Sequence, residues 1–276
     1  PAGLTLDEGS ARGRLVDTLQ QTAERTQADI RTLLSDRLEI GAVEAVKPFW
    51  IFNGLAVAGA RPKLVRELAH RPDVALVRLD HWRQWIEDPS PLEASESGSL
   101  VTALQRPDVV WGVARIGADQ VWHTLGISGT GVVVANLDTG VDWQHPDLQP
   151  AYRGYNPKGF HQHAGNWYDA TDAGSLYPVD GNGHGSHTMG IMIGQDGIGV
   201  APGARWIAVR GFQTDGYAFD SWLHDGFQWL LAPDGNPDLA PDIVNNSWGN
   251  NLGGANTFQQ DVKALRAAGI FAVFSA

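Results

Sequence analysis

The stretch Gly131-Val-Val-Val-Ala-Asn-Leu-Asp138-Thr139-Gly140 decides the fold of this chain. A short apolar run that is rich in β-branched residues and closed by a turn signal predicts a strand buried on both faces of a parallel sheet. In open α/β sheets the reacting groups lie at the carboxyl ends of such strands. Asp138 is therefore a candidate for chemistry, unless it only caps the following turn.

The rest of residues 107–276 alternates between strand and helix patterns. We expect strands at 131–137, 205–210, 241–247 and 270–275, and helices at 118–125, 184–193, 221–231 and 257–268. Residues 150–180 are rich in Gly, Asn, Tyr, His and Pro, and they predict a long loop. This alternation is typical of a doubly wound, mostly parallel sheet in the α/β class.

Residues 1–86 show another pattern, which predicts a small α+β domain. We expect a helix at 13–38, strands at 43–46 and 49–58, a helix that begins at Arg61-Pro62, and a strand at 74–79. Asn53-Gly54 is a turn signal, or a bulge if the second strand runs through it. The order α-β-β-α-β suits a sandwich of a helical layer on a sheet.

Residues 87–106 have the composition of a linker. They contain Asp88-Pro-Ser-Pro91 and the run Glu93-Ala-Ser-Glu-Ser-Gly-Ser99. Such segments are exposed and easily cut. The net charge also changes here, from −2 over residues 1–106 to −9 over 107–276. We therefore predict one domain at 1–86, a linker at 87–106 and a second domain at 107–276.

Composition excludes several classes of protein. A net charge of −11 over 276 residues argues against a nucleic-acid-binding surface. The chain contains no Cys, which excludes disulfides and thiolate chemistry. It has no apolar run long enough to span a membrane. Because it begins at Pro1 without a signal peptide and ends in a strand-like stretch, we expect it to be a piece of a longer protein.

A second candidate is the segment Asp180-Gly-Asn-Gly-His184-Gly-Ser-His187. A His flanked by small residues at a helix start has an unhindered ring, and it can act as a general base near its natural pKa. The alternative is a surface His at a helix N-terminus. His184 and His187 are three residues apart with Gly and Ser between them, whereas zinc helices place two His four apart around a Glu. The spacing therefore disfavours catalytic zinc, and His161 with His163 predicts a solvated pair in a loop.

The third candidate is Asn245-Asn-Ser247-Trp248-Gly249. A strand that ends in Ser-x-Gly can pair with an extended peptide by strand addition, or it can simply lead into a loop. Ser247 lacks the Gly-x-Ser-x-Gly setting of a nucleophile elbow. We therefore expect Ser247 to line a substrate groove and not to act as the nucleophile.

Together these segments resemble the subtilisin-like serine proteases, the subtilases. The resemblance rests on five blocks in the family's order: 133–142 with His145-Pro-Asp-Leu148, 183–187, 199–203, 246–249 and 272–276. Further stretches point to one branch of that family: 152–157, 166–170, 199–208 and 244–249. The resemblance implies a subtilisin-like sheet and a peptidase that works through an Asp-His-Ser triad.

The resemblance also implies roles for individual residues. Asp138 matches the triad carboxylate and His184 the general base, while Ser247, Trp248 and Gly249 match a strand of the substrate pocket. Gly216 and Tyr217 are the candidates for the opposite wall of that groove, and Asp180 and His187 are structural candidates near His184. Residues 1–86 resemble a propeptide, which acts as intramolecular chaperone and inhibitor. The expected partners are protein substrates and this propeptide, and we expect the protein to be secreted.

Two departures from the family pattern matter. The nucleophilic Ser in its Gly-Thr-Ser-Met-Ala setting and the oxyanion-hole Asn are absent from residues 1–276. We therefore expect the Ser to lie beyond residue 276 and this stretch to be inactive alone; the rival is a peptide-binding pseudoprotease. No cofactor is expected for the chemistry. Asp147 matches a calcium ligand of the family, but the short 188–198 segment offers few of the 6–8 oxygens that calcium takes.

Overall fold

The computed structural model describes residues 8–86, 109–249 and 256–275. These residues form two compact units. The first contains the described residues within 1–82, 219–240 and 254–270, and the second contains those within 83–218, 241–253 and 271–276. The linker predicted at 87–106 lies outside the described residues, so the domain boundaries at 86 and 107 stay predictions.

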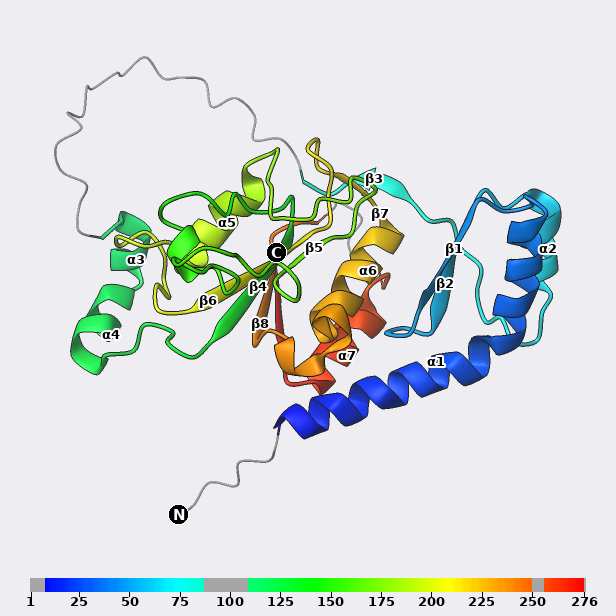
Figure 1. Ribbon diagram of the computed structural model, residues 1–276, viewed down its shortest axis with the longest axis horizontal. Helices are drawn as coiled ribbons and strands as arrows, with labels where there is room; N and C mark the ends of the chain where they lie inside the picture. The colour runs from blue at the N-terminus through cyan, green and yellow to red at the C-terminus, as the bar shows by residue number, and fades with distance from the viewer. Residues whose placement is uncertain (1–7, 87–108, 250–255, 276) are drawn as a thin grey trace. The chain divides into compact units, whose positions relative to one another are not determined.

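The second unit is built on a five-stranded parallel sheet (Figure 1). Its strands are β4 (Val133–Asp138), β5 (Trp167–Asp169), β6 (Arg205–Arg210), β8 (Ile243–Asn246) and β9 (Phe271–Phe274), in the order β5-β6-β4-β8-β9. Strand β4, the first in sequence, lies inside the sheet, and later strands are added on both sides of it. The predicted α/β class with a parallel sheet that winds in both directions is confirmed.

The prediction of a long loop over 150–180 holds for most of these residues, but it missed one strand. Strand β5 lies in this region and pairs with β6 at the edge of the sheet. It is only three residues long, and its sequence Trp-Tyr-Asp gives no alternation that a pattern search can detect. Strands β4, β6, β8 and β9 lie where their apolar runs predict them.

This unit also contains helices α3 (Trp111–Arg115), α4 (Ala118–Leu125) and α5 (His184–Ile193), with a short 3₁₀ turn, η1 (Gln149–Ala151). Helices α4 and α5 have the predicted bounds. Helix α5 packs on β4 and buries Met189 and Ile193 completely. Its apolar side joins a core with Val141, Tyr152 and Trp206, and this packing fixes the start of α5 relative to the end of β4.

The first unit begins with the α+β elements α1 (Glu8–Glu39), β1 (Ala45–Phe49), β2 (Gly54–Ala58) and α2 (Pro62–Ala69). Strands β1 and β2 form an antiparallel hairpin in which Phe49 pairs with Gly54. Asn53 has a positive φ of 55°, so the Asn-Gly pair is a turn and not a bulge. Buried residues of both helices form the core with Val43.

The predicted strand at 74–79 was wrong. These residues pair with no strand in the described part of the chain, and Leu76 and Leu79 are 74% and 71% exposed. Their sequence is an apolar run interrupted only by Arg78, but a strand also needs a neighbour that satisfies its backbone groups.

Helices α6 (Asp220–Leu231) and α7 (Gln259–Ala267) belong to the first unit, with the 3₁₀ turns η2 (Pro233–Gly235) and η3 (Pro237–Leu239). The hairpin packs on α6 because the Gln228 side chain accepts hydrogen bonds from the backbone N–H groups of Trp50 (2.7 Å) and Ile51 (3.3 Å). Lys47 forms an ion pair with the buried Asp225 of the same helix. None of the described helices combines the length and the apolar character that crossing a membrane requires.

Candidate functional site

Asp138 is the last residue of β4, and its side chain is fully buried. Strand β4 runs between β6 and β8, so both of its edges are paired and its carboxyl end is held firmly. One carboxylate oxygen, Oδ1, accepts the backbone N–H of Thr139 at 2.7 Å. The other, Oδ2, lies 3.3 Å from the hydroxyl of Thr188 on α5. The carboxylate therefore keeps a fixed orientation.

His184 opens α5 and faces this carboxylate. Its ring Nδ1 lies 2.7 Å from Oδ1 of Asp138, and its side chain is 26% exposed. The preceding Gly183 has a φ of 97°, a conformation that brings the chain into the helix and that side chains rarely adopt. The structure thus brings together two residues that lie far apart in sequence, at the carboxyl edge of the sheet.

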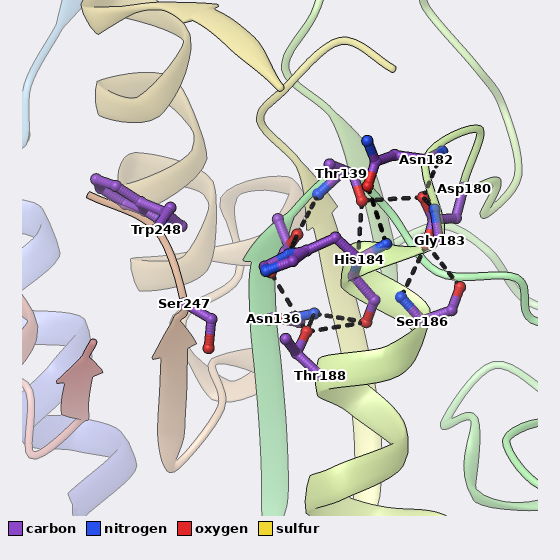
Figure 2. A network of polar contacts seen from close by, with 12 residues as sticks. Asn136, Thr139, Asp180, Asn182, Gly183, His184, Ser186, Thr188, Ser247 and Trp248 are labelled. Carbon is purple, nitrogen blue, oxygen red and sulfur yellow. Dashed lines mark hydrogen bonds and ion pairs between the residues drawn. The ribbon is translucent and has the colours of Figure 1, made fainter. Parts of the chain in front are cut away.

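Asp180 organises the turn before His184. Its Oδ1 accepts the hydroxyl of Thr139 at 2.9 Å and the backbone N–H of Gly183 at 2.8 Å. Its Oδ2 accepts the backbone N–H of Ser186 at 2.8 Å and the Ser186 hydroxyl at 2.7 Å. Figure 2 shows this carboxylate between the turn and the first residues of α5. A carboxylate here satisfies free N–H groups and complements the positive end of the helix dipole.

A buried polar network that sequence reasoning missed lies beneath the pair. Asn136 is completely buried in β4, and its amide donates to the carbonyl of Gly185 (3.0 Å) and to the hydroxyl of Thr188 (2.9 Å). Its own oxygen accepts the amide of Asn245 from β8 at 3.0 Å. The sequence contained a signal for this network, namely a polar residue, Asn136, in the middle of the apolar run 132–137. A polar side chain in a buried strand needs hydrogen-bond partners.

The pKa of His184 follows from this setting. The hydrogen bond to Asp138 raises the pKa of His184 above its usual value, burial opposes this, and the charges of Asp138 and Asp180 add to the increase. A ring that donates its Nδ1 proton to Asp138 keeps the lone pair of Nε2 for a proton from elsewhere. The arrangement can therefore act as a general base whose imidazolium form is stabilised by the buried carboxylate.

Ser247, Trp248 and Gly249 follow β8, and Figure 2 shows Ser247 and Trp248 across β4 from His184. The Ser247 hydroxyl exchanges hydrogen bonds with the Asn245 side chain, at 2.9 and 3.2 Å. Within the described part of the chain it makes no hydrogen bond to His184. The expectation that Ser247 lines a groove and is not the nucleophile stays a prediction.

Gly216 and Tyr217 lie opposite Gly249, with a segment of the chain itself between them. Strands β3 (Trp82–Gln84) and β7 (Tyr217–Phe219) pair with each other. Beyond β3, the backbone N–H groups of Trp85 and Ile86 donate to the carbonyl of Gly216 at 3.0 and 3.3 Å. The N–H of Gly249 donates to the carbonyl of Trp85 at 3.1 Å. The structure thus brings the two predicted walls to either side of one extended peptide.

The remaining candidates do not assemble a metal centre. His187 is exposed on α5, one turn from His184. The rings of His161 and His163 contact Trp143, with centroids 4.7 and 5.3 Å away. No group of three or more His, Asp or Glu side chains that could hold a metal ion occurs among the residues that the structure describes.

Asp147 is the residue that matches a calcium ligand of the family. Its carboxylate lies 4.0 Å from Nδ1 of His145. In the nearby loop the carbonyls of Gly194 and Gln195 already accept backbone hydrogen bonds. Calcium takes 6–8 oxygens, and the structure carries no ion, so the calcium site that the resemblance suggests at Asp147 stays a prediction.

Comparison with known proteins places this geometry in a family. The model of the subtilase family (peptidase S8) matches residues 129–276, more than half of the chain. Bacillopeptidase F of Bacillus subtilis (strain 168) is 39% identical over 281 residues, which cover 98% of this chain and 19% of that protein. Fervidolysin of Fervidobacterium pennivorans is 34% identical over 51% of this chain and 19% of its own length.

Subtilisin E of Bacillus subtilis is 29% identical over 72% of this chain and 42% of its own length. The chain thus spans about a fifth of the length of the first two relatives. The matched residues contain Asp138, His184 and the 247–249 segment. This chain belongs to the subtilase family.

Proposed function

We propose that this chain is the N-terminal part of a secreted serine endopeptidase that hydrolyses peptide bonds of proteins through an acyl-enzyme. In this proposal Asp138 orients and stabilises His184, and His184 is the general base. The nucleophilic Ser lies beyond residue 276, so residues 1–276 are inactive alone. The observation that carries the proposal is the 2.7 Å contact between Nδ1 of His184 and Oδ1 of the buried Asp138.

The proposed chemistry uses the free nitrogen of that ring. Nε2 of His184 takes the proton of the Ser hydroxyl while the Ser oxygen bonds to the substrate carbonyl carbon. The same nitrogen then gives this proton to the leaving amine as the C–N bond breaks, which leaves the acyl-enzyme. In the second half His184 takes a proton from water, and the Ser leaves with that proton as the carboxylic acid forms.

Residues 1–86 are proposed to be the propeptide that inhibits the enzyme. Support comes from the segment 83–86, which pairs with Gly216 and Gly249 as an extended peptide does in strand addition. The hairpin β1–β2 also packs on α6, a helix that lies within the family-matched residues. An element that fills the groove and holds a neighbouring helix suits an inhibitor of its own chain.

The test is a pair of variants of the full-length protein. His184→Ala should abolish both hydrolysis of casein and removal of residues 1–86, because it removes the general base of the proposed triad. His187→Ala is the matched control, since His187 is exposed one turn along the same helix, and it should retain both activities. Normal hydrolysis by His184→Ala would overturn the proposal.

Two rival functions have separate signatures. A peptide-binding pseudoprotease would bind peptides without hydrolysing them and would not react with a fluorophosphonate. A zinc hydrolase built on His184 and His187 would lose activity with a chelator and ignore the fluorophosphonate. The proposed endopeptidase should be inactivated by the fluorophosphonate, while its chemical step needs no metal. The presence of both Asp138 and His184 at 2.7 Å favours it over both rivals.

A further inference from the structure

The two oxygens of the buried Asp138 carboxylate are not supported alike. Oδ1 accepts the backbone N–H of Thr139 at 2.7 Å and faces Nδ1 of His184, also at 2.7 Å. In the part of the chain that the structure describes, Oδ2 meets a single hydrogen-bond donor, the hydroxyl of Thr188 at 3.3 Å. Burial raises the pKa of the Asp138 carboxyl, because a charge that is removed from water is destabilised. The donor at Oδ2 therefore matters for the charge of Asp138.

The side-chain amide of Asn136 controls what the Thr188 hydroxyl can do (Figure 2). Its NH₂ group faces the carbonyl oxygen of Gly185 at 3.0 Å, and because a carbonyl can only accept, this contact fixes the orientation of the amide. The same group donates to the Thr188 oxygen at 2.9 Å. On its other side, the Asn136 oxygen accepts the amide of Asn245 at 3.0 Å. The Thr188 hydroxyl thus receives one hydrogen bond and has its own proton to donate.

That proton has two acceptors within reach. The Thr188 oxygen lies 3.1 Å from the carbonyl oxygen of Gly185 and 3.3 Å from Oδ2 of Asp138. The carbonyl already accepts the amide of Asn136, whereas Oδ2 belongs to a carboxylate. Hydrogen bonds to an ionised acceptor are roughly twice as strong as those between neutral groups. The charge therefore favours donation to Asp138 over donation to Gly185.

A donor at Oδ2 acts on His184 through the charge of Asp138. While His184 is neutral, the carboxylate is a buried charge without a counter-charge, and it depends strongly on its hydrogen-bond donors. Once His184 is protonated, the imidazolium compensates the same charge, and the donor matters less. The Thr188 hydroxyl hence stabilises the pair with neutral His184 more than the pair with the imidazolium.

We propose that Thr188 is a positioning residue of the active site, whose hydroxyl stabilises the Asp138 carboxylate while His184 is unprotonated and so keeps the base available at lower pH. The inference rests on the proposed peptidase function. It adds to that function a residue that acts through Asp138 and sets the pH range in which the enzyme works.

The other charged groups near the pair stay the same when only this hydroxyl is changed. The pKa of His184 is raised by its hydrogen bond to Asp138 and, further, by the charge of Asp180 in the turn before α5. On the neighbouring strand β6, the guanidinium of Arg210 lies 3.6 Å from the carboxylate of Asp169. A shift that follows from the loss of the hydroxyl is therefore not caused by these groups.

The test is the pH profile of kcat/KM for the matured full-length enzyme on one chromogenic peptide substrate. Thr188→Val removes the hydroxyl and keeps the shape of the side chain. It should move the acid limb up by about half a pH unit or more, because a full hydrogen bond to a charged group corresponds to roughly 1–2 pKa units. Thr188→Ser keeps a hydroxyl and should keep the acid limb of the parent. Thr124→Val is the matched control, since this exposed hydroxyl donates to the carbonyl of Gln120 within α4, and it should leave the profile unchanged.

The direction of the shift separates this role from a structural one. A variant that only loosened the contact between His184 and Asp138 would lower the acid limb, because that hydrogen bond raises the pKa of His184. If Thr188→Val does not fold, Thr188→Ala removes the same hydroxyl and decides. An acid limb that stays or moves down without the hydroxyl, or that moves up equally in Thr188→Ser, overturns the inference while casein hydrolysis still stands. Absence of casein hydrolysis and of fluorophosphonate labelling in the unmodified protein would instead refute the proposed function.

Discussion

Gly185, the second residue of α5, packs directly on the backbone of Gly140. A Cβ atom on Gly185 would lie 2.0 Å from the carbonyl oxygen of Gly140 and 3.2 Å from Cβ of Asp138. The helix that carries His184 therefore touches the end of the strand that carries Asp138, with no side chain between them. This close approach is what allows a 2.7 Å hydrogen bond between the two side chains.

The first prediction tests this contact. Gly185→Ala should push α5 away from the end of β4, lengthen the bond between His184 and Asp138 and lower peptidase activity by at least tenfold. We expect the free energy of unfolding to fall by about 1–3 kcal/mol, the usual range for an overpacked site. Denaturant unfolding of the full-length protein, with casein hydrolysis as the second readout, measures both effects.

Gly190→Ala is the control for that variant. Gly190 lies in the same helix, but a Cβ atom there meets nothing within 4 Å. Because Ala is a better helix former than Gly by roughly 0.5–1 kcal/mol, this variant should be as stable as the parent or more stable, with unchanged activity. If the two variants behave alike, the contact between Gly185 and Gly140 does not control the site.

Much of the fold was predictable because its apolar runs are long and bounded by clear signals. The run before Asp138 defines β4, and the same reasoning located β6, β8 and α5. Strand β5 was missed because three residues at a sheet edge carry no period. The strand at 74–79 was predicted wrongly because pairing depends on a partner elsewhere in the chain, which a local pattern does not contain.

The candidate site was predictable only in part. Asp138 and His184 stand in motifs that the family resemblance identifies. The support given by Asn136, Thr188 and Asn245 depends on which strands are neighbours, a relationship that only the sheet order supplies. The same holds for Trp85, since no pattern in residues 83–86 shows that they lie against Gly249.

The second prediction concerns pH. The hydrogen bond that the His184 ring donates to Asp138 raises the pKa of His184, and the base must be unprotonated to act. The acid limb of kcat/KM should therefore lie above the ordinary histidine pKa of 6.5. Removing the charge with Asp138→Asn should move this limb to lower pH, while activity at the plateau falls by roughly 10⁴-fold. A pH profile of kcat/KM for both enzymes on one peptide substrate measures the shift. If the acid limb does not move, the titration of another group causes it.

The same pKa shift makes a statement about stability. A histidine whose pKa is raised on folding stabilises the folded state fully below its unfolded pKa, and this contribution is lost as pH rises through the folded pKa. The Asp138–His184 pair should thus contribute more to stability at a pH below the unfolded pKa of His184 than at a pH above its folded pKa. The measurement is the difference in melting temperature between the parent and His184→Ala at a series of pH values from below to above these two pKa values. This difference should become smaller as the pH rises.

The third prediction concerns the turn before α5. Asp180→Ala removes the acceptor of Thr139, Gly183 and Ser186, so the start of the helix should loosen. Loss of such a cap costs about 0.5–2 kcal/mol, and activity should fall because His184 follows directly. Asp142→Ala is the control, since this exposed carboxylate accepts the backbone N–H of Gln144 and should change stability by less than about 0.5 kcal/mol. Equal losses in both variants would remove the special role of Asp180.

The last prediction locates the cut that releases the propeptide. Residues 83–86 pair with Gly216 and Gly249, so the bond to be hydrolysed should follow them, within the linker predicted at 87–106. We therefore expect the N-terminus of the mature enzyme to lie in this span, whose Pro89, Pro91 and Ser-rich run give it the composition of a linker. N-terminal sequencing of active enzyme reads the position. The His184→Ala protein, prepared in parallel, should keep its original N-terminus, which shows that the cut is made by the enzyme's own site. A mature N-terminus before residue 87 would mean that the bound segment is not the product side of the cut.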